Sequence, residues 1–169
     1  MNVEEKAKKI KLLILDVDGV MTDGRIIYDN FGDEFKAFDV QDGYGMVLWC
    51  RAGLKSAIIT AKKSRIVSRR AKMCHVTKVF QEARDKGAVY EKLLKIFKLT
   101  GEEVCFMGDD LIDLPVMKRA GLAVAVPYSR EEIKSFAHYV TKADPGRGAV
   151  REVVELIMKS QNKWPQIAP

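Results

Sequence analysis

The sequence predicts an α/β fold in which helices cover both faces of a doubly wound parallel sheet. Three observations lead to this prediction: short apolar runs recur along the chain, a segment with helical periodicity follows most of them, and one hairpin-like segment interrupts the alternation. Strand–helix alternation is typical of parallel sheets whose two faces are both buried. We therefore expect one domain over residues 1–169.

Composition and charge narrow the class of protein. The 169 residues, 47% of them hydrophobic, are enough to bury a core without disulfides or a structural metal. No apolar run approaches the length that spans a bilayer, and residues 1–11 lack a signal-peptide core, so we expect a cytoplasmic protein with no membrane partner. The spacing of the three cysteines fits neither a zinc site nor a disulfide framework. The net charge of +6 is spread through helices, which disfavours nucleic acid and suits anionic substrates.

The individual elements follow from the apolar and helical patterns. A charged, helix-like lead-in covers residues 1–11. Apolar runs predict strands at residues 12–15, 57–59, 76–80, 104–107 and 122–126. Helical periodicity predicts helices at about residues 44–52, 64–73, 86–97, 111–119 and 149–160.

The interruption after the first strand indicates a β-hairpin over about residues 25–39. Residues 25–28 and 34–39 flank a turn-forming segment at 29–33 that contains Gly32. A two-stranded ribbon is marginal on its own and exposes its edges. We therefore expect the hairpin to be covered by self-association of the chain.

Acidic side chains follow the predicted strands where a ligand would bind. Ligands of open parallel sheets bind outside the carboxyl ends of the strands. The polar residues at those ends are Asp16, Asp18, Thr60, Asp109 and Asp110, with Asp113 in the next helical turn. Clustered carboxylates repel one another unless a cation compensates them, and ligands that are all oxygen favour Mg²⁺.

A calcium-binding EF-hand is the nearest structural alternative for the acidic run. That loop needs Gly at its sixth position and Glu at its twelfth, where this chain has Met21 and Ile27. It also needs a preceding helix, whereas Asp16 follows a predicted strand. We therefore exclude the calcium loop.

Four short motifs resemble, in order, the signatures of the haloacid dehalogenase superfamily. Residues 16–24 read Asp-Val-Asp-Gly-Val-Met-Thr-Asp-Gly, similar to the DxDGxxTDG signature of its small sugar-phosphate phosphatases. The other three motifs are Ile58-Ile59-Thr60 with Lys62, then Asp85-Lys86, then Gly-Asp-Asp-Leu-Ile-Asp-Leu-Pro at residues 108–115. The resemblance implies a Rossmann-like core, and a chain of this length belongs with the members that have no cap domain.

The resemblance also implies a role for each matching residue. Asp16 corresponds to the nucleophile that attacks phosphorus, and Asp18 to the residue that protonates the leaving oxygen and later activates water. Mg²⁺ is expected on Asp16, Asp109 and the backbone carbonyl of Asp18. Asp110 and Asp113 are expected to orient the metal's waters and Lys86.

The transferring phosphoryl group is expected to be bound by three groups. Thr60 and Lys86 correspond to the residues that stabilise charge on the phosphoryl oxygens. The backbone N–H of Ala61 corresponds to a third donor, although this position usually holds Gly in the superfamily. The added methyl group restricts how closely the backbone approaches phosphate, while the amide donor is kept.

The hairpin, residues 108–115 and residues 146–152 together resemble the 3-deoxy-D-manno-octulosonate 8-phosphate phosphatase family. This resemblance implies hydrolysis of that sugar-acid phosphate in lipopolysaccharide precursor synthesis. It also implies a homotetramer with paired hairpins and a C-terminal tail, about residues 146–169, that covers a neighbour's site. A phosphatase of N-acetylneuraminate 9-phosphate or another small phosphorylated metabolite is the alternative. The substrate's carboxylate calls for a cationic partner, for which the candidates are Lys62, Arg69, Arg70 and Arg147.

Two other classes of protein use a similar fold. A phosphoacceptor receiver domain also clusters Asp, Thr, Lys and Mg²⁺, but its phosphorylated Asp ends the third strand, where this chain has Gln81 and Glu82. A binding module that has lost activity is the other alternative, against which the intact acidic set argues.

Overall fold

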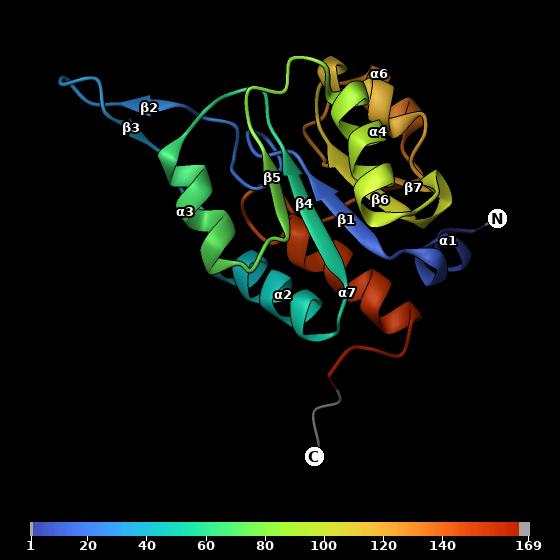
Figure 1. Cartoon of the computed structure of the whole chain (residues 1–169). Coiled ribbons are helices and arrows are strands. Elements are labelled where there is room, and N and C mark those ends of the chain that lie inside the picture. Colours follow the sequence, from blue (N-terminus) through green and yellow to red (C-terminus); the bar gives the residue numbers. More distant parts are fainter. Residues whose placement is uncertain (1, 166–169) are drawn as a thin grey trace.

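A six-stranded parallel sheet forms the centre of the protein (Figure 1). The computed structural model describes residues 2–165, so residues 166–169 of the expected tail lie outside the described part. The strand order is β5-β4-β1-β6-β7-β8. The strands are β1 Leu12–Leu15, β4 Lys55–Ile59, β5 Lys78–Phe80, β6 Val104–Gly108, β7 Leu122–Ala125 and β8 Tyr139–Val140.

Helices cover both faces of this sheet, because its central strands are apolar on both sides. Leu13 and Leu15 of β1 belong to one hydrophobic cluster, and Leu12 and Ile14 to the other, as the alternation of a strand requires. The first cluster is completed by α1 Val3–Lys9, α2 Val40–Arg51, α3 Arg65–Met73 and α7 Ala149–Ser160. The second is completed by α4 Lys86–Phe97, α5 Leu114–Met117 and α6 Glu131–Phe136. The predicted doubly wound α/β fold is confirmed.

Several boundaries differ from the sequence prediction for local reasons. The helix α2 begins at Val40, before the expected residue 44, because Asp39 caps it by accepting from the Asp42 N–H. The expected helix 111–119 is a 3₁₀ turn, η2 Leu111–Asp113, followed by the short α5, whose first turn contains Pro115. The strand β8 and helix α6 were not expected, and both are short. Another 3₁₀ turn, η1 Gly101–Glu103, precedes β6.

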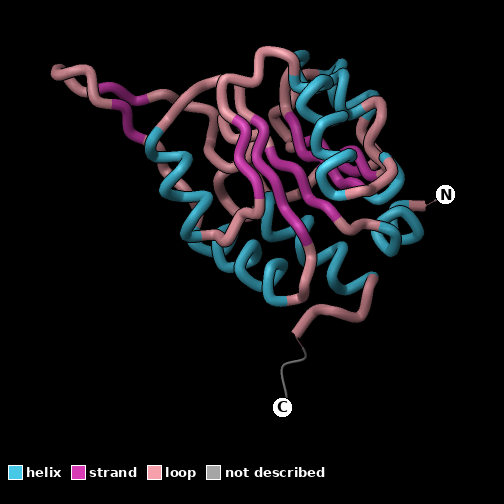
Figure 2. Tube along the Cα trace, viewed as in Figure 1, coloured by secondary structure: helices cyan, strands magenta, loops and turns pink. Residues whose placement is uncertain are grey.

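The hairpin projects away from the body of the protein (Figures 1 and 2). It forms a separate antiparallel sheet of β2 Ile27–Tyr28 and β3 Glu34–Phe35, shorter than the expected strands. Its turn is held by the Asp29 carboxylate, which accepts from the backbone N–H groups of Phe31 and Asp33.

Across residues 2–165, no helix combines the length and the apolar character needed to cross a bilayer.

Candidate active site

The site lies where the chain reverses its direction of winding across the sheet. β1 pairs with β4 on one side and β6 on the other, so the carboxyl ends of these three strands are neighbours. Asp16, Thr60 and Asp109 directly follow β1, β4 and β6. Such a reversal is where open α/β sheets bind ligands. We call Asp16, Thr60, Lys86 and Asp109 the catalytic edge, after the roles that the motif resemblance implies for them.

A glycine after β1 lets the loops following β1 and β6 meet. Gly19 adopts a φ of +89°, which L side chains rarely adopt. A Cβ atom there would lie 2.1 Å from Oδ2 of Asp109. The loop itself wraps around the Thr22 hydroxyl, which accepts from the backbone N–H of Gly24 at 3.2 Å. The absence of a side chain at residue 19 is therefore what allows Asp109 to reach this position.

Three carboxylates and one lysine converge at this edge. Asp16, Asp109 and Asp113 each offer a carboxylate oxygen, and these oxygens lie within 4.8 Å of one another. Nζ of Lys86 lies 2.7 Å from Oδ1 of Asp16 and 2.7 Å from Oδ1 of Asp113. Asp113 also accepts from the Asp109 N–H at 3.0 Å. Asp113 thus orients both Lys86 and the backbone of the Asp109 loop.

The electrostatics of this cluster favour an additional cation. Burial raises the pKa of Asp16 to about 6, although the neighbouring Lys86 opposes that rise. Burial, followed by the charges of Asp16 and Asp113, raises the pKa of Asp109 to about 7. The pKa of Lys86 is raised because its two carboxylate partners outweigh the effect of its own burial. One lysine does not offset these carboxylates, and their oxygens suit a hard divalent ion.

Most of the predicted residues line one cavity of about 180 Å³ at the catalytic edge. Asp113 lies fully buried behind it. Asp110 reaches the rim, where its carboxylate also caps η2 by accepting from the Leu111 N–H at 2.7 Å. The cavity is lined by Asp16, Asp18, Thr60, Ala61, Lys62, Lys86, Asp109, Asp110 and Ile112, of which only Ile112 was not predicted.

Three of the four substrate candidates lie outside this cavity. Arg70 donates to the carbonyl of Asp39 and lies over the Phe38 ring, with its guanidinium 5.4 Å from the ring centre. Arg69 is exposed on α3. Arg147 lines a neighbouring hollow of about 440 Å³ at the root of the hairpin. Lys62 is the candidate that the structure brings into the catalytic cavity.

Sequence reasoning missed Lys36, which reaches the site from the hairpin. Its side chain is fully buried, and Nζ forms ion pairs with Oδ1 of Asp18 and, at 2.8 Å, with Oε1 of Glu34. In the sequence, a lysine between polar and apolar hairpin residues is typical of a solvated position. Only the return of the hairpin toward the end of β1 reveals the contact.

The family model of haloacid dehalogenase-like hydrolases matches residues 54–153, more than half of the chain. The chain belongs to the haloacid dehalogenase-like hydrolase family. This confirms the resemblance inferred from the four motifs. As a member of this family the protein is a hydrolase, and its fold places Asp16 after the central strand β1. The receiver-domain alternative is not supported, because β5 is followed by Gln81 and Glu82.

Relatives of this hydrolase resemble it over nearly its whole length. It is 44% identical over 96% of its residues to the 3-deoxy-D-manno-octulosonate 8-phosphate phosphatase KdsC of Yersinia pestis, covering 87% of that protein. It matches the structure of the corresponding Moraxella catarrhalis phosphatase in complex with magnesium, phosphate and KDO, with a TM-score of 0.94 and 41% identity over 96% of this chain and 93% of that one. It also matches the cobalt-bound Haemophilus influenzae phosphatase, with a TM-score of 0.89 and 32% identity over 93% and 92% of the two chains.

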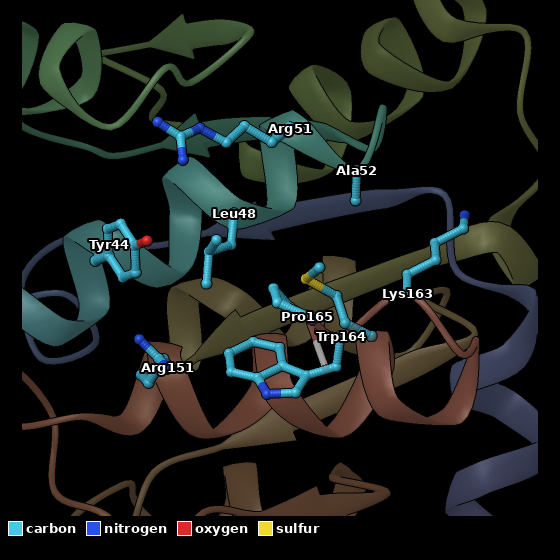
Figure 3. Close-up of a pocket in the computed structure, with 9 residues that line it drawn as sticks. Tyr44, Leu48, Arg51, Ala52, Arg151, Lys163, Trp164 and Pro165 are labelled. Atoms are coloured by element: carbon cyan, nitrogen blue, oxygen red, sulfur yellow. The ribbon is translucent and has the colours of Figure 1, made fainter. Parts of the chain in front are cut away.

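A second hollow of this hydrolase, about 600 Å³, lies between α2 and α7 and does not include the catalytic edge (Figure 3). Trp164 lies against α7 there, with Nζ of Lys159 5.5 Å and the Arg151 guanidinium 4.7 Å from its ring centre. The hollow is lined by Tyr44, Leu48, Arg51, Ala52, Arg151, Met158, Lys163, Trp164 and Pro165, none of which the sequence predicted as a site residue. This hollow is larger than the cavity at the catalytic edge, but it contains none of the predicted site residues, so we do not take it as the candidate active site.

Proposed function

We propose that this hydrolase is a Mg²⁺-dependent phosphatase that hydrolyses 3-deoxy-D-manno-octulosonate 8-phosphate through an aspartyl-phosphate on Asp16. The observation that carries the proposal is the convergence of Asp16, Asp109 and Lys86 at the end of the central strand. The relatives that match 96% of the chain and bear the name of that activity support the choice of substrate. In this reading the reaction belongs to lipopolysaccharide precursor synthesis in the cytoplasm.

The donor set at the catalytic edge fits Mg²⁺. Asp16, Asp109 and the backbone carbonyl of Asp18 are the groups that would hold it, and all three offer oxygen. The raised pKa values of Asp16 and Asp109 have the physical cause that a divalent ion relieves, namely uncompensated negative charge in a buried site. When bound, the ion supplies positive charge that neutralises the phosphoryl oxygens and the nucleophile's carboxylate.

In the first half of the reaction, a carboxylate oxygen of Asp16 attacks phosphorus while the bond from phosphorus to the sugar oxygen breaks. Asp18 gives its proton to that leaving oxygen, so the sugar acid departs as a neutral alcohol at this position. Lys86, Thr60 and the N–H of Ala61 bind the phosphoryl oxygens. Asp113 holds Lys86 in place through its 2.7 Å ion pair.

In the second half, water attacks the phosphorus of the aspartyl-phosphate. Asp18, now ionised, takes a proton from that water as the bond between phosphorus and the Asp16 oxygen breaks. Inorganic phosphate leaves, the Asp16 carboxylate is restored, and Asp18 regains the proton it gave up. The same residue thus acts first as an acid and then as a base, which requires it to remain close to the phosphorus in both steps.

The sugar acid's carboxylate is assigned to a cation at the mouth of the cavity. Lys62 is the first candidate, because it lines the cavity together with the catalytic residues. Arg147 is the second, since it lies at the hairpin root beside Asp23. Arg69 and Arg70 are weaker candidates, because neither lines the cavity. Arg70 also donates a hydrogen bond to the backbone carbonyl of Asp39.

The exposed apolar surface of the hairpin supports self-association, and we propose a homotetramer built through it. Phe31 is 93% exposed, and Tyr28 and Phe35 are more than half exposed. A projecting apolar patch of this kind marks an interaction surface. The expected tail over residues 146–169 is partly committed to the chain's own core, because α7 is buried against the sheet. Gln161 and Trp164 also contact the chain's own body, since Gln161 donates to the carbonyls of Ala7 and Ile10 and the ring centre of Trp164 lies 4.7 Å from the Arg151 guanidinium. Residues 166–169 of the expected tail lie outside the described part of the chain.

The substrate assignment is tested by comparing kcat/KM for three esters with Mg²⁺ present. The expected order is 3-deoxy-D-manno-octulosonate 8-phosphate first, N-acetylneuraminate 9-phosphate second and p-nitrophenyl phosphate last. Equal values for all three would reject the sugar-acid assignment while keeping the phosphatase. No phosphate release from any of them would reject the phosphatase itself.

A further inference from the structure

Lys36 is an unusual residue for a hairpin because its charged side chain is fully buried. Its Nζ is held between Oδ1 of Asp18 and Oε1 of Glu34, whose side chains are 23% and 22% exposed. A buried ammonium group is costly unless it is paired and hydrogen-bonded. Asp18 accepts the hydrogen bond of Lys36, and Glu34 supplies a second negative charge at ion-pair distance, so the three side chains form one charged cluster.

The position of this charged cluster relates it to the reaction. Asp18 lines the catalytic cavity, and Lys36, which is not among the residues that line it, contacts Oδ1 of Asp18 from the hairpin. Lys36 comes from the hairpin just after β3, and Glu34 is itself a residue of β3. The orientation of Asp18 therefore depends on a segment outside the central sheet.

We propose that Lys36 is a positioning residue that fixes the carboxyl group of Asp18 for proton transfer and ties its orientation to the hairpin. This inference rests on the proposed function of Asp18. Lys36 engages Oδ1, which leaves Oδ2 as the oxygen that would exchange a proton with the leaving group and later with water. Without Lys36, Asp18 is free to rotate about its side-chain bonds, and only steps that need its proton are slowed.

The test uses Lys36→Met, which keeps a long apolar side chain and removes the ammonium group. With 3-deoxy-D-manno-octulosonate 8-phosphate, kcat is expected to fall by about 10²-fold, the lower range of general acid–base catalysis, with KM changed by less than about twofold. The alkoxide of a sugar is a poor leaving group and needs the proton of Asp18.

A second substrate separates the two halves of the reaction. Nitrophenolate leaves without a proton, so aspartyl-phosphate formation from p-nitrophenyl phosphate needs little help from Asp18. Lys36→Met is therefore expected to release about one nitrophenol per active site in a rapid burst, followed by slow turnover limited by the attack of water. Rapid-mixing absorbance measurements report both phases.

Two further variants keep the test decisive. Glu34→Gln removes the lysine's other partner and is expected to give the same pattern with a smaller loss, even where Lys36→Met folds poorly. Lys63→Met is the matched control, because Lys63 is 75% exposed and forms its ion pair with the exposed Glu82 at 3.4 Å. The control is expected to match the wild-type protein in kcat, KM and burst amplitude.

The outcomes distinguish this inference from the proposed function. Wild-type protein that releases no phosphate from either ester rejects the phosphatase. Active wild-type protein with unchanged kinetics in Lys36→Met and Glu34→Gln overturns the positioning role. A raised KM at constant kcat in Lys36→Met would also overturn it, because Lys36 would then bind substrate. An equal loss on both esters without a burst would assign Lys36 to the integrity of the whole site.

Discussion

The catalytic edge and the hairpin both follow β1, yet they differ in how completely the chain itself covers them. At the edge, Lys86 is buried and satisfied by Asp16 and Asp113 at 2.7 Å each. In the hairpin, four residues pair across the two strands and Phe31 is 93% exposed. The side chains of one region are satisfied within a single chain, whereas the apolar side chains of the other are exposed, as the proposed self-association requires. Lys36 joins them, since it lies in the hairpin and contacts Asp18.

The largest effect is expected from Asp16→Asn. This variant tests whether Asp16 is the nucleophile or contributes only negative charge to the catalytic edge. The amide keeps the size of the carboxylate but is not a nucleophile toward phosphorus. Turnover is expected to fall by on the order of 10⁴-fold or more, as for loss of a catalytic nucleophile. Phosphate release measures this, with thermal unfolding as the check on folding. Glu91→Gln, on the exposed side of α4, is the control. Undiminished turnover in Asp16→Asn would reject the nucleophile.

Removal of divalent metal is expected to have the next largest effect. Chelation should lower phosphate release by about 10³-fold, because the phosphoryl charge then lacks its counter-ion, and added Mg²⁺ should restore it. Mg²⁺ at about 100 times its Kd should also stabilise the fold by about 2.7 kcal/mol, visible as a raised Tm. Asp109→Asn should abolish that Tm shift. Full activity after chelation would show that the reaction does not need a metal ion bound at the acidic cluster.

Gly19→Ala tests whether the edge depends on close approach of its two loops. The new Cβ would lie 2.1 Å from Oδ2 of Asp109, in a backbone conformation with φ of +89° that Ala rarely adopts. We expect Asp109 to be displaced, with Mg²⁺ affinity and kcat each reduced by about 10²-fold, since a shift near 1 Å has that effect. Metal titration by calorimetry measures the affinity.

Gly53→Ala is the control for strain alone. Gly53 has a similar φ of +78°, but a Cβ there would meet nothing within 4 Å. Its effect should be confined to stability. If Gly53→Ala reduced Mg²⁺ affinity as much as Gly19→Ala, backbone strain rather than crowding of Asp109 would be the cause.

The contrast between the catalytic edge and the hairpin also explains how much of the site could be predicted from the sequence. Asp16, Thr60 and Asp109 were predictable because apolar runs locate the strands and the carboxyl ends of parallel strands meet at one edge. The resemblance added roles, which stay predictions. Lys36 was not predictable, because its proximity to the site depends on the path of the hairpin. Ile112 lies between two predicted acids of the fourth motif, but its apolar side chain offers no chemistry that would mark it. The strand β8 was missed because its two residues carry too little pattern.

The contact between α2 and the first turn of α7 predicts a pH-dependent stability. Asp42, four per cent exposed, accepts from the backbone N–H of Arg151 at 2.7 Å, and burial raises its pKa to about 6. Its folded-state pKa exceeds the unfolded value of 3.8, so its stabilising contribution is fully present below about pH 4 and is lost as pH rises through about 6. The change is about 3 kcal/mol in the free energy of unfolding. Urea unfolding of Asp42→Asn should lack this part of the pH dependence, and an unchanged pH profile would contradict the assignment.

The smallest effect on turnover is expected from Phe31→Ser, which tests whether the hairpin needs a partner. Phe31 contributes little to the core of the monomer, so the Tm of the diluted, monomeric protein should change little. In sedimentation experiments, the proposed oligomer of Phe31→Ser should dissociate at protein concentrations at which the wild-type oligomer is still intact. Turnover should fall only a few-fold, because the four residues of the edge come from one chain, although dissociation removes the support that Lys36 receives through the hairpin and any cover from a neighbour's tail. Tyr128→Ser, at a residue 75% exposed on the loop after β7, is the matched control and should leave the oligomer intact. An unchanged sedimentation profile for Phe31→Ser would remove the hairpin tip from the interface, and a loss of turnover as large as that of Asp16→Asn would show that the two regions are not separable.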